Sequence, residues 1–197
     1  MRFLSALAVF LLLPLTGHAA SLQAIEAYFN QLKTFQADFT QVDPDGGIAE
    51  GELFLKRPGR MRWNYTTPSE VVMITQGDNL LYYDKVMDEV SYLPLDDIAA
   101  SMLIQSEVDF DTGDFKVVTL QDEAGITRLT LEQIGAPEQG QFTLVLRSQP
   151  MQLYSIILDQ QGQVTRMSMS NIRQNAGLDD KVFDFKNPRG LVDPTQR

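Results

Sequence analysis

The 197-residue chain is long enough for one domain with a sizeable core, and its net charge of −10 argues against partners such as nucleic acid or anionic bilayers. It has no cysteine and a single histidine, which excludes disulfides, cysteine nucleophiles and the usual zinc ligand sets.

Residues 2–19 have the pattern of a secretory signal. Arg2 supplies a positive start, residues 4–15 form an apolar run, and Gly17-His18-Ala19 is a small-x-small cleavage site. The apolar run is shorter than the about 20 residues that span a membrane. We therefore expect a cleaved signal peptide, with a retained anchor as the alternative.

Cleavage after Ala19, with Ala20 as the alternative, would give a signal peptide over 1–19 and a single domain over 20–197. The mature chain would then carry 15 basic and 26 acidic residues, a net charge of −11, and no histidine, so His-based triads are excluded. A lipid-anchored protein of the periplasm would need a cysteine at its mature N-terminus, and this sequence has none. We therefore expect a soluble periplasmic protein.

The first expected element is an amphipathic helix. Ser21 can cap it, and an apolar stripe over about three turns follows at Leu22, Ile25, Phe29 and Leu32. A helix this short is not stable alone, so we expect its stripe to pack on an apolar surface.

From Phe35 the period changes to two, which predicts a strand with Phe35, Ala37 and Phe39 on one face. The following stretch, 51–65, predicts two strands joined at Pro58-Gly59, because proline lacks an N–H and glycine accepts unusual dihedral angles. One face of the second strand carries Met61, Trp63 and Tyr65.

Eight more apolar runs of strand length are separated by turn residues, and a ninth lies near the end of the chain. They cover 70–76, 80–84, 86–93, 115–120, 126–133, 142–146, 153–159, 164–172 and 182–185. Short strands at this spacing are typical of an antiparallel sandwich or barrel.

Residues 94–105 interrupt the strand pattern. Asp96 or Asp97 can cap a helix, and the apolar positions that follow predict a short α-helix of two to three turns. Those apolar positions are Ile98, Met102, Leu103 and Ile104.

The order Gly51, Lys56-Arg57-Pro58, Trp63, behind a signal peptide and a short helix, resembles the periplasmic outer-membrane lipoprotein carriers, the LolA family. The resemblance extends to the closing segment 183–190. It implies a mainly β fold: a single curled antiparallel sheet forming an unclosed barrel of about 11 strands, with short α-helices as a lid over an apolar cavity. Without the resemblance, the same stretch is an ordinary β corner with a surface arginine and a core tryptophan.

The resemblance places acyl chains in that cavity. The side chains expected to bind them are Met61, Trp63, Tyr65, Ile98, Met102, Leu103 and Ile104. A fully packed core accounts for these residues equally well. The resemblance also makes Arg57 the lid latch, which would hydrogen-bond backbone carbonyls of the lid helices when the cavity is empty. The lid departs from the family at Ala100-Ser101, where Thr-Pro is often found.

The function implied is a soluble periplasmic carrier without cofactor, metal or enzymatic activity. Its implied partners are acylated lipoproteins, an ATP-driven inner-membrane lipoprotein-releasing complex and an outer-membrane lipoprotein receptor, and we expect a monomer. The alternative within binding proteins is a lipid- or lipoprotein-sensing receptor module of the same fold.

A carboxylate-dependent hydrolase is the alternative from another class. It would use one of the acidic pairs Asp96-Asp97, Asp109/Asp111 or Asp179-Asp180. Such pairs in an acidic protein are mostly solvated caps. Residues 109–113 also resemble the start of a calcium loop but lack the later glutamate at the required spacing.

Overall fold

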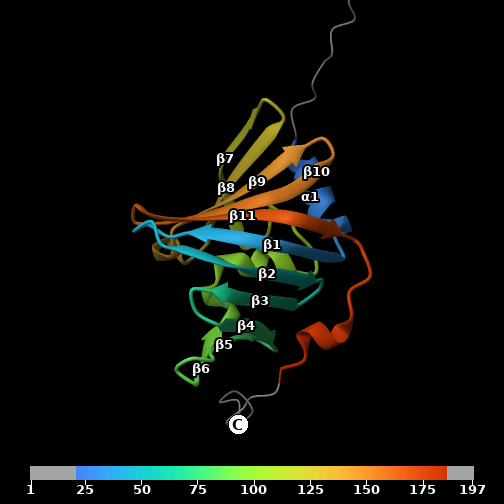
Figure 1. Cartoon of the computed structure of the whole chain (residues 1–197). Helices are drawn as coiled ribbons and strands as arrows, with labels where there is room; N and C mark the ends of the chain where they lie inside the picture. The colour runs from blue at the N-terminus through green and yellow to red at the C-terminus, as the bar shows by residue number, and fades with distance from the viewer. Residues whose placement is uncertain (1–20, 186–197) are drawn as a thin grey trace, which may run out of the picture.

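The computed structural model describes residues 21–185, apart from the side chains of Asp97 and Ala99. The expected signal peptide over 1–19 and both ends of the expected domain over 20–197 lie outside the described residues. Within them, one antiparallel sheet of eleven strands curls around a single α-helix (Figure 1). The predicted class, mainly β with an unclosed barrel of about 11 strands, is confirmed.

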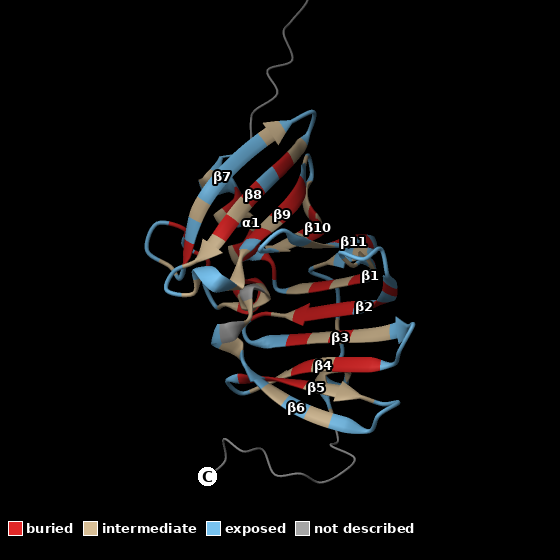
Figure 2. Cartoon of the chain, turned by 90° about the vertical axis from the view of Figure 1, so that its left-hand side faces the viewer, coloured by how far each residue is buried: buried red, intermediate tan, exposed pale blue. Residues whose placement is uncertain are grey.

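The helix, α1 (Leu22–Gln31), begins as predicted. The Ser21 side chain accepts a hydrogen bond from the backbone N–H of Ala24 at 3.2 Å. Ile25 and Phe29, from the predicted apolar stripe, are fully buried. Figure 2 shows α1 on the concave side of the sheet, so the stripe packs against the inner face of the strands.

The sheet is two meanders joined through the first and last strands. The strands are β1 (Thr34–Val42), β2 (Ile48–Lys56), β3 (Arg60–Thr67), β4 (Val71–Gln76), β5 (Asn79–Asp84), β6 (Glu89–Pro94), β7 (Phe115–Glu123), β8 (Ile126–Gln133), β9 (Gln141–Ser148), β10 (Met151–Gln160) and β11 (Gln163–Gln174). Their spatial order is β6-β5-β4-β3-β2-β1-β11-β10-β9-β8-β7, so β6 and β7 are the edges. Because these edges do not pair, the barrel stays open.

The predicted α-helix between the strands is wrong. Residues 94–105 form two 3₁₀ helices instead, η1 (Leu95–Asp97) and η2 (Ala99–Ile104), which we call the lid segment (95–104). Ile98 separates them in an extended conformation, and no side chain caps η2. Pieces this short gain few i→i−4 bonds, so tight 3₁₀ turns compete successfully with an α-helix.

The predicted last strand over 182–185 is wrong as well. Residues Asp180–Phe183 form a 3₁₀ helix, η4, which Asp179 caps by accepting a hydrogen bond from the N–H of Lys181 at 3.0 Å. A further short 3₁₀ helix, η3 (Pro137–Gln139), connects β8 to β9.

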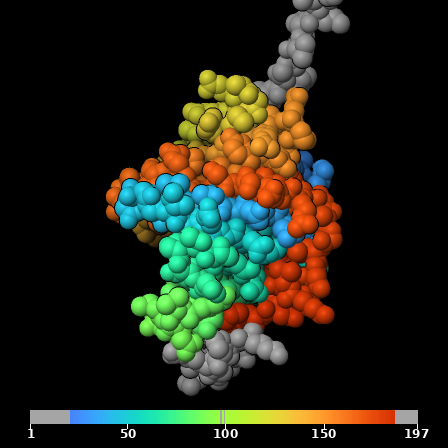
Figure 3. Space-filling model, in the orientation of Figure 1, coloured from blue at the N-terminus to red at the C-terminus, as the bar shows by residue number. Residues whose placement is uncertain are grey.

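The segment around η4 lies on the outer face of the sheet, against β3. The Arg62 side chain donates to the carbonyl oxygen of Val182 at 2.8 Å, and Phe183 and Phe185 pack on the small outer cluster of Val72, Ile74 and Leu81. In the space-filling view this red segment lies against the lower half of the sheet (Figure 3). Arg62 is therefore not an open solvent-face residue; it anchors residues 179–185, which we call the C-terminal segment.

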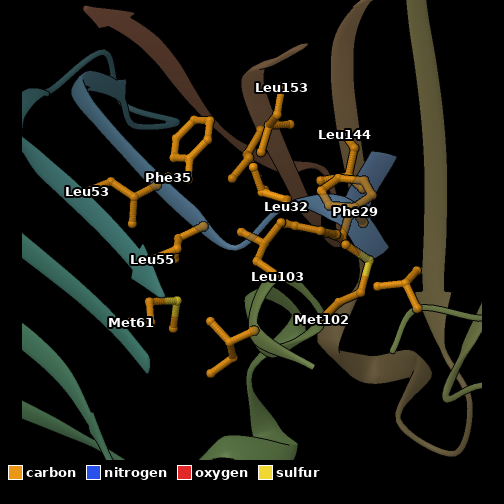
Figure 4. Packing of buried hydrophobic residues seen from close by; sticks show 14 of the residues in the cluster. Phe29, Leu32, Phe35, Leu53, Leu55, Met61, Met102, Leu103, Leu144 and Leu153 are labelled. Carbon is orange, nitrogen blue, oxygen red and sulfur yellow. The ribbon is translucent and has the colours of Figure 1, made fainter. Parts of the chain in front are cut away.

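The main core lies between the two halves of the curled sheet. In Figure 4, Phe29 and Leu32 from the α1 region, Met102 and Leu103 from η2, and the inner residues of both sheet halves point toward one another. Helix and lid segment thus fill one end of the barrel with side chains, and a pocket can remain only beyond them.

Candidate functional site

An apolar pocket of about 280 Å³ lies inside the barrel. Its walls come from both halves of the sheet and from the lid segment: Gln41, Trp63, Tyr65, Met73, Leu80, Leu93, Ile98, Ala100, Gln139, Phe142, Ile156, Leu158, Gln160, Thr165 and Met167. Small-molecule sites usually occupy about 300–1,000 Å³. In this conformation the pocket is therefore near the lower end of the range for binding sites.

The pocket lining changes from apolar to polar along the strands. On four strands the lining residue nearest a hairpin turn carries a polar group: Gln41, Tyr65, Gln160 and Thr165. These turns lie at one end of the barrel, because neighbouring strands are antiparallel. We call this the turn end of the pocket. Deeper positions on the same strands are apolar, so the pocket suits a molecule with an apolar tail and a polar head.

The structure divides the seven residues expected at an acyl site into two groups. Trp63, Tyr65 and Ile98 line the pocket. The other four lie in the packed core next to it and do not line it: Met61, Met102, Leu103 and Ile104. Figure 4 shows three of them, Met61, Met102 and Leu103, in that packed core.

The larger part of the pocket wall was missed from the sequence. Ile156, Leu158 and Gln160 share the inner face of β10, and Met167 lies on the same face of β11. Their period-two alternation was visible and predicted the strands. It carried no information about which inner face would border a gap rather than a packed neighbour.

Arg57 lies where β2, α1 and the lid segment meet. Its guanidinium donates to the carbonyl oxygen of Gln105 through Nε at 2.9 Å and Nη2 at 2.6 Å, and Nη1 donates to the carbonyl oxygen of Phe29. Both acceptors lie at the C-terminal ends of helices: Phe29 O, in the last turn of α1, also accepts from Leu32 N at 3.1 Å, and Gln105 is the residue that follows η2. The backbone N–H of Gly59, in the same corner, donates to Ile104 O at 2.8 Å.

The environment of Arg57 is largely desolvated. The side chain is only 8% exposed, and its burial lowers its pKa from the usual value. A guanidinium still keeps its proton in proteins, so Arg57 is a buried cation held by carbonyl dipoles. Within residues 21–185 its side chain donates only to backbone carbonyl oxygens, so the bonds to both helix ends depend on the direction of its N–H groups.

A second set of bonds ties α1 to the chain that follows the lid segment. The Asn30 side chain donates to Val108 O at 2.9 Å and accepts from Val108 N at 2.8 Å, and Glu26 accepts from Phe110 N at 2.9 Å. The Tyr28 hydroxyl accepts from Leu153 N at 3.0 Å, which fixes α1 to β10. Helix α1 is thus hydrogen-bonded to residues 108–110 on one side and to β10 on the other.

Of the acidic residues considered for hydrolysis, those whose side chains are described do not line the pocket: Asp96, Asp109, Asp111, Asp179 and Asp180. Asp109 accepts bonds from Asp111 N and Thr112 N in a local turn, and Asp180 pairs with Lys56 and, at 3.1 Å, with Arg60. Among residues 21–185, no three His, Cys, Asp or Glu side chains are grouped so that they could hold a metal ion. Nor is any helix in that range both long and apolar enough to cross a membrane.

The fold and the pocket define a class of protein: a curled, unclosed antiparallel sheet that holds an internal apolar pocket beneath a helix and a short lid segment. The model of the family "Outer membrane lipoprotein carrier protein LolA" matches residues 30–186. The chain belongs to this family.

Two relatives and one solved structure illustrate the similarity. An outer-membrane lipoprotein carrier protein of Methylococcus capsulatus is 30% identical over 177 residues, covering 85% of this chain and 84% of that protein. One of Halorhodospira halophila is 30% identical over 201 residues, covering 96% and 93%. A putative outer membrane lipoprotein-sorting protein domain from Vibrio parahaemolyticus has the same fold, with a TM-score of 0.52 at 10% identity over 82% of this chain and 94% of that one.

Proposed function

We propose that the protein is a periplasmic carrier that shields the acyl chains of lipoproteins in its apolar pocket and hands them on. The observation that supports this most strongly is the pocket itself, which lies inside the sheet of a lipoprotein-carrier family member. Its lining is apolar on the inner side and polar at the turn end, which matches the two parts of an acylated peptide.

The physical chemistry of acyl chains restricts how such a carrier works. Each buried methylene contributes about 0.8 kcal/mol relative to water, so a chain of about 14 contributes roughly 11 kcal/mol. Three chains would contribute roughly 33 kcal/mol, beyond the practical limit of about 20 for non-covalent affinity. The comparison that matters is therefore with a membrane or another protein. Loading needs an external energy source, and unloading needs a receptor that binds the chains better.

The requirements for loading and for unloading each call for a partner, and the proposal includes both. An ATP-driven inner-membrane lipoprotein-releasing complex loads the carrier, and an outer-membrane lipoprotein receptor unloads it. The carrier works as a monomer, without cofactor or catalysis. The proposal also requires residues 1–19 to be a cleaved signal peptide that sends the chain to the periplasm.

The pocket must enlarge to hold a lipoprotein. A volume of about 280 Å³ is close to the minimum for one small ligand and far below what three acyl chains require. In the proposed cycle the lid segment moves away from β2, and Arg57 acts as the latch of the empty state through its bonds to Phe29 and Gln105.

The experiment has a binding step and a transfer step. Trp63 is the only tryptophan and forms part of the pocket wall, so its fluorescence should change when a purified acylated lipopeptide is added. The same peptide without acyl chains is the control. The loaded protein is then mixed with the outer-membrane receptor, and the lipopeptide should move to the receptor.

Three outcomes separate the possibilities. The carrier function is supported if the acylated peptide moves to the receptor and the peptide without acyl chains does not. Binding without transfer would favour a sensing or receptor module. Absence of binding at saturating lipopeptide would overturn the proposal.

A further inference from the structure

One polar atom in the pocket wall has no partner. The indole Nε1 of Trp63 is buried and makes no hydrogen bond within residues 21–185, and the whole side chain is only 5% exposed. Buried N–H groups are nearly always paired, since an unpaired one costs about 1–3 kcal/mol. An indole can only donate, so the missing partner must be an acceptor.

The position of Trp63 along β3 indicates where that acceptor would come from. The inner residues of this strand run from Met61 in the packed core, through Trp63, to Tyr65 at the turn end. The Tyr65 hydroxyl already donates to Gln41 Oε1 at 2.9 Å. Trp63 is therefore one inward-facing position deeper than the polar residues of the turn end, at the boundary between head and tail of a bound amphiphile.

A second buried atom without a partner among the described residues belongs to another residue of the pocket lining. Gln139 lines the pocket, and its Oε1 is buried without a hydrogen-bond partner within the described range. Its Nε2 makes only a long contact of 3.5 Å with Asp96 O. A pocket for hydrocarbon alone gains nothing from buried, unpaired polar atoms in the residues that line it.

We propose that the pocket recognises the carbonyl group through which an acyl chain is attached, and that Trp63 Nε1 donates a hydrogen bond to this carbonyl oxygen. The inference rests on the proposed carrier function and adds the chemical class that the pocket selects: ester- or amide-linked chains rather than alkyl chains as such. Filling the pocket then satisfies a donor that the empty protein leaves unpaired. The chain beyond the carbonyl contacts the apolar walls formed by residues such as Ile156 and Met167.

The test varies the ligand and the protein together. The probes are two singly acylated peptides of equal chain length, one with an ester link and one with an ether link, which lacks the carbonyl. Affinities of the whole chain for both are measured by calorimetry. The wild type should bind the ester about tenfold more tightly, the usual effect of one hydrogen bond in a desolvated site.

Trp63→Phe keeps an aromatic ring but removes the donor. This variant should lose the preference, binding ester and ether peptides equally, as a double-mutant cycle requires for a direct contact. The matched control is Phe142→Leu, a change to another lining residue, on β9, whose side chain has no polar atom. It should weaken both peptides alike and leave the ester-to-ether ratio at its wild-type value.

If Trp63→Phe fails to fold, Trp63 is replaced by its benzothiophene analogue, which keeps the size of the indole and has sulfur in place of N–H. An unchanged ester-to-ether ratio in either variant overturns the carbonyl contact but leaves the carrier function intact. If the wild type binds neither peptide, the carrier proposal itself fails, and the inference fails with it.

Discussion

Arg57 shows at the scale of one residue how a single side chain can connect three elements. Its planar fork reaches the last turn of α1 and the residue that follows η2, while its own backbone N–H donates to Lys33 O at 2.8 Å, just beyond the paired ends of β1 and β2. A lysine could supply one charge but not the same set of directed bonds. The geometry of Arg57 therefore suits the latch proposed for the empty state, in which it holds α1 and the end of the lid segment together.

Arg57→Leu should load lipopeptide at least as well as the wild type and release it more slowly to the receptor. Each bond from a charged donor contributes about 1.5–3 kcal/mol, so loss of the latch should shift the balance toward the open form by about tenfold or more. Arg57→Lys should restore part of the release rate. Loading and release are measured separately with purified carrier and receptor.

The control for this experiment is Arg173→Leu. Arg173 is exposed and pairs with Gln36 across the β1–β11 ladder. Both residues lie on the outer face of the sheet, whereas the lid segment packs against the inner face. Arg62 is unsuitable, because it holds the C-terminal segment. Wild-type release by Arg57→Leu would show that Arg57 is only a structural residue of the β2–β3 corner.

Gly51 is a second residue whose side chain, or lack of one, decides local packing. A Cβ at this position would lie 2.0 Å from the backbone oxygen of Asn64 and 2.8 Å from the Phe39 ring. Gly51→Ala would push β3 away from β2 and should destabilise the protein by about 1–3 kcal/mol, as overpacking usually does. Urea unfolding would measure this, and Gly177→Ala, where the added atom meets nothing within 4 Å, should change stability little. Equal midpoints for the two variants would contradict the steric account.

At the scale of elements, α1 and the chain after the lid segment behave as one attached unit. Asn30 makes two hydrogen bonds to the backbone of Val108, a residue that is only 3% exposed. Glu26 adds a bond to the N–H of Phe110. The chain is thus held twice just after η2, by Arg57 at Gln105 and by α1 at 108–110, and the lid segment (95–104) precedes both contacts.

Asn30→Ala should remove the attachment of Val108 to α1. It leaves the N–H and the carbonyl of Val108 unpaired, for an expected loss of about 1–3 kcal/mol in unfolding free energy. Hydrogen exchange of the Val108 amide should accelerate. The control is Gln31→Ala, one position along α1 on an exposed side chain, where the expected change is below about 0.5 kcal/mol. Unchanged exchange at Val108 in Asn30→Ala would refute this attachment.

At the scale of the whole molecule, two partly buried tyrosines make stability sensitive to alkaline pH. Burial raises the pKa of Tyr28 to about 12, and burial, with Asp43 and Tyr82 nearby, raises that of Tyr65 to about 12. Above pH 10 the unfolded chain loses these protons while the folded chain keeps them. Stability contributed by these groups is therefore complete below pH 10 and is lost as the pH rises toward 12.

Tyr65→Phe should flatten this alkaline decline, because one of the two shifted groups is gone. Urea midpoints of wild type and variant at pH 8, 9, 10 and 11 would show it as a smaller drop above pH 10 in the variant. Parallel curves for the two proteins would mean that Tyr65 does not contribute to the pH dependence.

The sequence by itself determined the sheet. Period-two alternation in stretches such as Phe35–Phe39 and Met61–Tyr65 predicted strands correctly, because an apolar face on every second residue can be buried only as a strand. The Ser21 cap with its 3.6-period stripe likewise predicted α1. Both patterns are local, because each depends only on the order of residues within one helix or strand.

Only the tertiary structure decided the lid and the pocket. The lid segment became 3₁₀ because its short pieces are shaped by the sheet and α1 rather than by their own propensities. Met61 and Trp63 have the same pattern in the sequence, yet one packs against η2 and the other borders a gap. Whether an inner face meets a neighbour or empty space depends on the curvature of all eleven strands and on where α1 enters between them. That information is spread over contacts between residues far apart in the chain, and no local period contains it.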